Sequence, residues 1–491
     1  MYKQSILLAL LLCTIHSFSQ EIVNSTPVAL KKNKAVFQIV NNATKETTLF
    51  VSDKEKVKAI RLNEKMQIID SLSTLRLDSK IYVAMIGYTK KNDNINLFWT
   101  SDNHKDIFIQ PFNFDKLNSE NKTYSLPLKD EKYVQNFSQN GKFYIMTVLK
   151  NSDKLKLYVF DTEGKLEEKI IDLTGLKFFK SDYKKTTMYG VFEESYYATE
   201  LPFSIQKIRP ENPTSLVESS KKRKCYSVGN TIVLTFDSNL DHTQLITLDL
   251  DKYNATEKFI KKPYISFTER FELNSNSFLI DNHLYQMKCS SSQLILSVKD
   301  LEDNLIKSYE ASNENPIIDF KNSNYIQENG GTTKTRILDT SSQFIRKTNN
   351  SNSGISCYKL NDNYLVTIGS VSQEQQQASA GAIAGAMMFG MVGAVAGSLI
   401  DSAISNPTME SFNSYANRKV VYINGLFDKD ANHIKGEIDP LAFDKIRIFF
   451  IRIQMFLRRP YINWIISIIL DITTIKQKNI PFASLKINTV L

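Results

Sequence analysis

Apolar and polar residues alternate with a period of two, in runs of five to eight residues, along most of this chain. Turns rich in Asn, Asp, Ser, Gly and Lys separate the runs. Such alternation is typical of β-strands with one buried face. The clearest runs predict strands at Ala35–Val40, Thr47–Ser52, Ile81–Gly87, Ile95–Thr100, Phe143–Leu149, Leu155–Phe160, Thr231–Phe236, Gln244–Asp249, Leu284–Cys289, Gln293–Val298, Tyr364–Val371 and Lys419–Asn424.

A unit of strands recurs loosely along the chain. A strand of the type KFYIMTVLK is followed by one like KLKLYVFD, then by a turn such as DTEG and a strand such as KLEEKIIDL. Four short strands in about forty residues, repeated six to eight times, are what a β-propeller requires, because each blade buries its apolar faces only on its neighbours. The second strands are expected to begin near Thr48, Ile95, Leu155, Phe203, Gln244, Gln293, Arg336 and Lys419.

We therefore predict an all-β, β-propeller-like fold of about six to eight blades over residues 20–444. Two stacked β-sandwiches or two smaller propellers are the alternatives. The chain has neither a WD pattern nor a kelch-type diglycine repeat. It is similar to secreted bacterial β-propeller proteins in its repeat pattern alone, and such a resemblance implies no activity.

One segment, ASAGAIAGAMMFGMVGAVAGSLI at residues 378–400, interrupts this pattern with 23 positions that carry no charge. On a helix its glycines and alanines form two adjacent ladders, and such a smooth groove lets a second helix approach closely in lipid. The segment resembles the glycine-zipper stretches of membrane-associated bacterial envelope proteins. The resemblance implies membrane contact or self-association through Gly381, Gly385, Gly390, Gly393, Gly397, Met387, Met388 and Phe389.

The position of this segment restricts how it can meet a membrane. If Tyr364–Val371 and Lys419–Asn424 are neighbouring strands of one blade, a single membrane crossing between them would place them in different compartments. A single helix of 23 residues would measure about 34 Å, enough to span a bilayer, whereas two halves would measure about 16 Å each. We predict a helical hairpin within an insert at residues 372–417. Internal packing, dipping into a membrane and a true span remain open.

The N-terminus has the features of a secretory signal peptide at residues 1–19. Lys3 precedes an apolar run, Ile6 to Cys13, and the small residues Ser17 and Ser19 fit the cleavage positions. We therefore predict an exported protein located in the periplasm, in the outer membrane or outside the cell. Lipidation at Cys13 is an alternative, although Leu12 stands where that signal has a small residue.

Most of the net positive charge of the chain lies in its C-terminal 47 residues. The chain carries a formal net charge of +9, of which residues 445–491 contribute +7 and Lys3 contributes +1, so residues 20–444 have a net charge of +1. That near-neutral body argues against nucleic acid as a partner. The basic run Lys221 to Lys224 is interpreted as a solvated loop between strands. The Ile-rich tail after residue 445 is either a basic membrane anchor or the product of a reading-frame error that replaces a closing strand.

The sequence contains few signs of catalytic chemistry. Removal of the signal peptide would leave Cys225, Cys289 and Cys357, which we interpret as buried thiols. The spacing of Asp428, Asp430 and Asn432 suggests a calcium loop, but His433 stands where that loop needs Gly, so a polar turn is preferred. No local motif of a hydrolase, a zinc site or a phosphate loop occurs. We predict no cofactor and no metal.

Two functions are compatible with these patterns. The first is a non-catalytic exported module that binds a protein or glycan at the cell envelope, with the glycine-rich insert serving membrane contact or self-association, including homo-oligomer formation. The second is a hydrolase or lyase that acts on envelope polymers, with acids gathered at one propeller face. We prefer the first.

Overall fold

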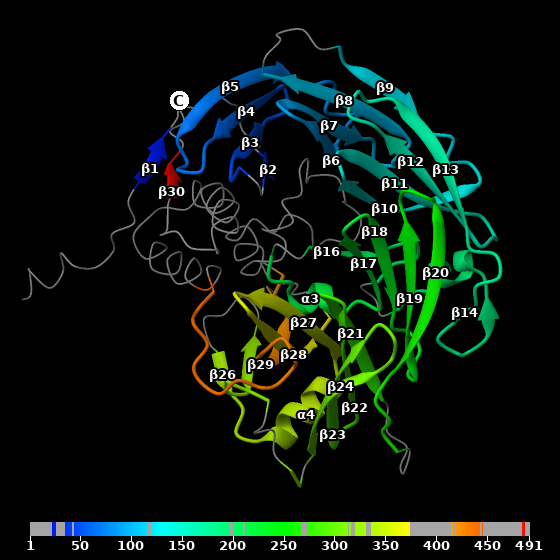
Figure 1. The fold of residues 1–491 in the computed structure, drawn as a ribbon, viewed down its shortest axis with the longest axis vertical. Helices are drawn as coiled ribbons and strands as arrows, with labels where there is room; N and C mark the ends of the chain where they lie inside the picture. Colours follow the sequence, from blue (N-terminus) through cyan, green and yellow to red (C-terminus); the bar gives the residue numbers. More distant parts are fainter. Residues whose placement is uncertain are drawn as a thin grey trace, which may run out of the picture. The chain divides into compact units, whose positions relative to one another are not determined.

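The computed structural model describes most of the strand-rich part of the chain (Figure 1). The described residues are 22–25, 35–41, 44–114, 120–196, 200–209, 212–266, 273–312, 314–315, 320–329, 335–373, 414–415, 418–441, 444 and 484–486. The predicted signal peptide and the glycine-rich segment 378–400 lie outside them, as does most of the tail. Internal contacts divide the chain into two compact units, Met1–Leu75 with Leu441–Leu491, and Arg76–Pro440.

The first unit contains one four-stranded antiparallel sheet. Its strands follow the order β2-β3-β4-β5, and the central residues Leu49, Phe50 and Val51 are fully buried. A separate parallel pair joins β1 to β30, the described part of the tail. The strands are β1 (Ile22–Ser25), β2 (Ala35–Val40), β3 (Thr47–Ser52), β4 (Lys56–Leu62), β5 (Ile68–Leu75) and β30 (Ser484–Lys486).

The second unit repeats the same design. Three sheets have four strands each, in the orders β6-β7-β8-β9, β10-β11-β12-β13 and β21-β22-β23-β24. Their strands are β6 (Ala84–Lys91), β7 (Asn94–Thr100), β8 (Asp106–Asn113), β9 (Lys122–Ser125), β10 (Glu131–Gln139), β11 (Lys142–Leu149), β12 (Lys154–Phe160), β13 (Leu166–Asp172), β21 (Asn274–Ile280), β22 (His283–Cys289), β23 (Gln293–Asp300) and β24 (Leu305–Ser312).

Two further sheets of this unit have five strands, in the orders β16-β17-β18-β19-β20 and β26-β25-β29-β28-β27. A short hairpin, β14 (Phe178–Phe179) with β15 (Lys185–Thr186), stands apart. The other elements are β16 (Gln206–Ile208), β17 (Arg223–Val228), β18 (Thr231–Phe236), β19 (His242–Asp249), β20 (Asn254–Lys261), β25 (Ile326–Asn329), β26 (Thr335–Ile337), β27 (Asn352–Leu360), β28 (Asn363–Val371), β29 (Lys419–Phe427), α2 (Met188–Glu193), α3 (Leu216–Ser219) and α4 (Ser341–Asn349).

This arrangement confirms the predicted all-β, β-propeller-like repeat. Within the described ranges the two units together contain six sheets of four or five strands, a number within the predicted range. The repeat deduced from the sequence corresponds to β11, β12 and β13, which are consecutive antiparallel neighbours. Tight turns join such strands: Asn140 and Gly141, with φ of 50° and 74°, connect β10 to β11, as expected of a two-residue hairpin.

Two strand predictions were wrong in position. Phe203 begins no strand; it has a φ of 55° and its amide donates to the carbonyl of Phe192 at the end of α2. The strand predicted at Ile81–Gly87 begins three residues before β6, because Ile81 and Tyr82 are held in a turn by the carbonyl of Asp78. A period-two pattern of apolar residues can continue into a neighbouring turn, so the pattern does not show at which residue strand pairing begins.

Adjacent sheets of the second unit share aromatic and aliphatic cores. Phe98 of β7 lies 4.4 Å from Phe143 of β11, measured between ring centroids, and 5.1 Å from Phe160 of β12. Gly87 of β6 permits this packing: a Cβ atom there would lie 2.2 Å from the Phe143 ring. The absence of a side chain at this glycine therefore lets the β6–β9 and β10–β13 sheets pack closely.

Candidate functional site

The basic run at residues 221–224 is not a solvated loop, which corrects the sequence-based interpretation. Lys222, Arg223 and Lys224 are 8%, 0% and 0% exposed, and the last two begin β17. Lysine and arginine are this deeply buried only when they are paired. The partners come from other elements: Glu200 and Asp237 supply carboxylates, and the β21 strand supplies amide and carbonyl oxygens.

Asp237, directly after β18, is the centre of this buried network. Its Oδ2 atom accepts from the Lys224 ammonium at 3.0 Å and from the Ser277 hydroxyl at 2.7 Å. Its Oδ1 atom lies 3.2 Å from Lys262 Nζ and accepts from the Thr243 hydroxyl at 2.8 Å. One carboxylate therefore holds two ammonium groups, one from β17 and one from the residue that follows β20.

Burial and charge act in opposite directions on these groups. Burial would raise the pKa of Asp237, but the ammonium groups of Lys224 and Lys262 hold that pKa well below its usual range. Burial, together with the positive charges of Lys222 and Lys224, lowers the pKa of Lys262 to about 8, although the Asp237 carboxylate opposes this shift. Asp237 is therefore ionised at neutral pH, and the pKa of Lys262 lies well below the ordinary value of a lysine.

Arg223 forms a second centre with Glu200. Its Nε atom donates to Glu200 Oε1 at 3.2 Å, and the backbone amide of Arg223 donates to the same oxygen at 3.0 Å. The remaining guanidinium donors bond to the backbone carbonyls of Val191, Phe192, Glu194 and Leu201. Arg223 thus ties β17 to α2 and to the segment that follows it.

The network is closed to ligands. The side chains of Lys224, Asp237 and Lys262 are all 0% exposed, and the Lys262 ammonium also donates to two backbone carbonyls and to Ser275. Asn276 of β21 extends the network by donating to the carbonyls of Ser220 and Ser353. These contacts join three sheets of the second unit, so the role of the network is structural.

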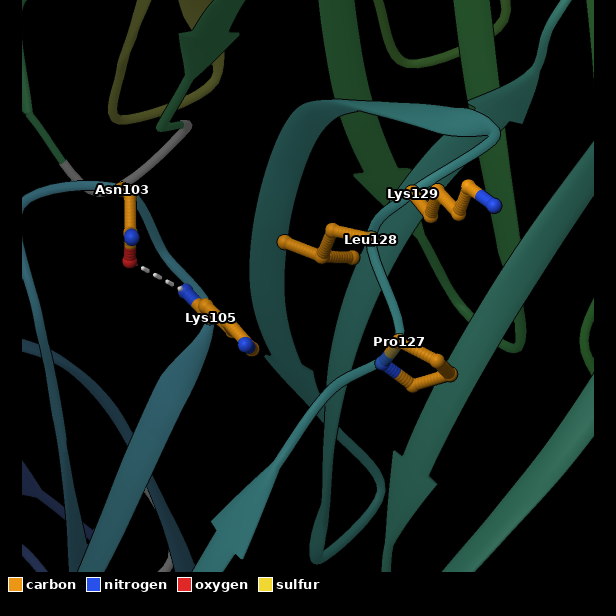
Figure 2. A pocket seen from close by; sticks show the side chains of 5 residues that line it. All are labelled: Asn103, Lys105, Pro127, Leu128 and Lys129. Atoms are coloured by element: carbon orange, nitrogen blue, oxygen red, sulfur yellow. Dashed lines mark hydrogen bonds between the residues drawn. The ribbon is translucent and has the colours of Figure 1, made fainter.

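An open groove of about 320 Å³ lies elsewhere in the same unit. One wall is the β7–β8 turn and the other is the link between β9 and β10 (Figure 2). We call it the 103–129 groove; its lining residues are Asn103, Lys105, Pro127, Leu128 and Lys129.

Hydrogen bonds and one ring contact fix the walls of the 103–129 groove. The Leu126 amide donates to the Lys105 carbonyl at 2.8 Å and so joins the two walls. His104 has a φ of 58°, and its ring stacks on Tyr133 of β10 with centroids 3.9 Å apart. Burial lowers the pKa of His104, so its ring is neutral at pH 7. The groove is therefore formed in advance of any ligand.

Sequence reasoning did not identify the 103–129 groove. Its residues come from two polar turns, SDNHKD and LPLKD, that are separated by two strands and match no motif. The residues proposed for membrane contact or self-association, Gly381 to Gly397 with Met387, Met388 and Phe389, lie outside the described residues. They stay a prediction.

Other candidate residues have structural roles. Cys225, Cys289 and Cys357 are buried free thiols, as predicted, and burial raises the pKa of Cys225 and of Cys289 to about 12. Asp428 accepts from the amides of Asp430 and Asn432, which confirms a polar turn. Among the described residues, no three His, Cys, Asp or Glu side chains gather where they could hold a metal ion.

Comparisons with known proteins give no family. No family model matches the chain, and no curated protein matches it. Among solved structures, a mutant of Synechocystis apocarotenoid oxygenase matches with a TM-score of 0.29 and 8% identity over 57% of this chain and 62% of that protein. The cobalt-substituted enzyme matches with a TM-score of 0.28 and 7% identity over the same shares.

The aligned part thus spans less than two thirds of those proteins, and likeness at this level supports no conclusion about activity. Within the part of the chain that the structure describes, no helix is long and apolar enough to cross a membrane.

Proposed function

We propose that the protein is an exported, non-catalytic module of the cell envelope that binds a protein or glycan partner. In this proposal the glycine-rich insert provides membrane contact or self-association. One observation carries the role proposed for the insert: the two ends of the insert are paired in one sheet. β28 and β29 are antiparallel neighbours, with Val371 opposite Val420 and Ser370 opposite Val421.

Hydrogen bonds continue this pairing to the boundary of the insert. The Ser372 amide donates to the Lys419 carbonyl at 2.8 Å, and the Lys419 amide donates to the Ser372 hydroxyl at 2.9 Å. Both ends of the insert therefore leave the second unit at the same end of the β28–β29 pair. An even number of membrane crossings, including none, is compatible with such ends, whereas a single span would separate paired strands.

The pairing also defines a clean deletion. Ser372 and Lys419 stand opposite each other, so replacing residues 373–418 by Asn-Gly would close β28 and β29 with a two-residue hairpin turn. A second variant keeps the length of the insert and changes Gly381, Gly385, Gly393 and Gly397 to Leu. It preserves apolarity but fills the groove that close helix approach requires.

The test is membrane fractionation of the exported protein together with mass measurement by light scattering. We expect the deletion to release the protein from membranes or to dissociate an oligomer, with an unchanged β-rich circular dichroism spectrum. The leucine variant separates the two roles: it should retain lipid binding but lose self-association. Unchanged partition and unchanged mass after the deletion would refute the proposed role of the insert.

A further inference from the structure

We propose that β5, the last strand of the sheet in the first unit, pairs with β5 of a second copy of this chain to form a two-fold symmetric dimer. This inference goes beyond the proposed function, because it uses neither the glycine-rich insert nor an envelope partner. β5 pairs with β4 on one side, and none of the described strands pairs with its other side (Figure 1). It is therefore an edge strand, and an edge strand can take up a further strand.

The side chains of β5 give this edge an apolar surface. Ile68, Ile69 and Leu75 are 37%, 48% and 72% exposed, and Leu72 between them is half-buried. No other described strand has more than one large apolar side chain that is exposed to this degree. Such side chains are normally scattered singly, and a group of them marks a contact surface.

β5 also lacks the charges that keep edge strands apart. The last strands of three sheets in the second unit contain several charged residues, namely Glu167, Glu168, Lys169 and Asp172 in β13, Glu257, Lys258 and Lys261 in β20, and Lys307 and Glu310 in β24. β5 contains one charged residue, Asp70. Arg61 of β4 neutralises it, since Arg61 Nε donates to Asp70 Oδ1 at 2.8 Å and Nη2 donates to Oδ2. Charged side chains on an edge oppose pairing with another chain, so this edge is unprotected.

The strand is complementary to itself, which identifies a second copy as the partner. Two identical strands related by a two-fold axis perpendicular to their sheet run antiparallel. In the register centred on Leu72, Ile69 lies opposite Leu75 of the partner copy, and Asp70 lies opposite Thr74. Like charges do not meet, because Asp70 would face itself only in a register centred on Asp70. The exposed apolar side chains of each copy are thus covered by those of the other.

The symmetry of this pairing limits its size. A two-fold contact uses the same edge of both copies, so it closes at two chains and does not continue into a fibre. One pair of eight-residue strands is smaller than a standard protein interface, which buries about 1,600 Å². We therefore expect a dimer that dissociates on dilution.

The test measures the mass of the full mature chain by light scattering over a range of concentrations. The mass of the wild type should rise with concentration, and Ile69→Lys should have half that mass at the highest concentration, because a lysine on an edge strand opposes pairing. Ile170→Lys is the matched control: it places the same charge on β13, at an apolar side chain that is 45% exposed. The control should associate like the wild type, and circular dichroism checks that both variants are folded.

Hydrogen exchange locates the contact. The amides of Ile68 to Ser73 should exchange more slowly in the wild type at high concentration than at low concentration, and this difference should be absent in Ile69→Lys. A wild type whose mass does not change with concentration, or an Ile69→Lys variant with the mass of the wild type, would overturn the proposal. Replacing residues 373–418 by Asn-Gly should leave the β5 dimer intact, so failure here and failure of the role proposed for the insert are distinguishable.

Discussion

At the scale of single residues, Asp237 supplies the counter-charge of two buried lysines in the second unit. Its carboxylate contacts the ammonium groups of Lys224 and Lys262 and fixes Ser277 through two hydrogen bonds. Both lysines lie in the interior, where removal of their counter-charge cannot be compensated by water. The stability of the junction between β17, β18 and β21 therefore depends on this one side chain.

We predict that Asp237→Asn lowers the free energy of unfolding by about 3–5 kcal/mol, because it leaves buried ammonium groups without a counter-charge. Urea denaturation followed by circular dichroism measures the loss. Asp300→Asn serves as the control, since Asp300 is a half-buried turn residue whose carboxylate mainly accepts local amides. A loss no larger than that of the control would contradict the prediction.

The lowered pKa of Lys262 predicts a pH dependence. Its pKa is about 8 in the folded protein and about 10.4 in an unfolded chain. Between these values the unfolded state binds more protons, so this lysine makes the free energy of unfolding rise with pH. Buried tyrosines and thiols have raised pKa values and act in the opposite direction, so the effect must be isolated by comparison with a variant.

We predict that the stability of the wild type relative to Lys262→Met increases by on the order of 2 kcal/mol between pH 8 and pH 10. Paired urea denaturations at closely spaced pH values give this difference. Titrating groups that do not interact with Lys262 cancel in the comparison, since both proteins contain them. A difference that stays flat across this window would show that Lys262 does not titrate there.

At the scale of elements, the β28–β29 pair decides how the insert is attached. Gly369 lies opposite Tyr422 in this pair, and a Cβ atom there would lie 1.9 Å from the Val421 carbonyl oxygen and 2.8 Å from Tyr422 Cα. Both contacts are with backbone, which cannot move without breaking the pairing. The glycine is thus required by close approach of the neighbouring strand.

Gly369→Ala should therefore destabilise the second unit by at least about 2 kcal/mol through overpacking. Gly229→Ala is the matched control: it has a φ of 56° and no atom within 4 Å of an added Cβ. It should lose about 1 kcal/mol, the cost of a left-handed conformation for an L-residue. Thermal unfolding of both variants measures the two losses of stability. A larger loss for Gly229→Ala than for Gly369→Ala would contradict the prediction.

At the scale of the whole molecule, the two units differ in whether a described strand of the C-terminal tail belongs to them. Five sheets of four or five strands, within the described residues of the second unit, are built between Arg76 and Pro440. The described strand beyond Asp444 is β30, and it pairs with β1 of the first unit. The repeated sheets of the second unit thus draw none of their described strands from the tail.

A chain cut after Asp444 is accordingly expected to keep the amide protection of β6 to β29, while the parallel pair with β1 is lost. Hydrogen exchange read by mass spectrometry resolves the two units separately. Protection lost throughout the second unit would mean that the tail contributes to its fold, and would argue against its origin in a reading-frame error.

The sequence by itself determined the strand-rich class of this protein. The patterns at Thr47–Ser52 and Thr231–Phe236 predicted β3 and β18 with correct bounds, and the structure shows that both strands are buried on both faces. The sequence also predicted strands before and after the glycine-rich segment, and the structure shows that these two strands, β28 and β29, are neighbours. The positions of these strands could be predicted from the local pattern of apolar and polar residues alone.

Only the tertiary structure decided the location of the charges and of the groove. The run KKRK is hydrophilic in sequence, but Glu200, Asp237 and Asn276 surround it with partners from three distant segments. Likewise, Asn103 and Lys129 line one groove only because the β7–β8 turn and the β9–β10 link lie together in the folded chain. Pairing of buried charge is a property of partners far apart in the chain, and no local period encodes it.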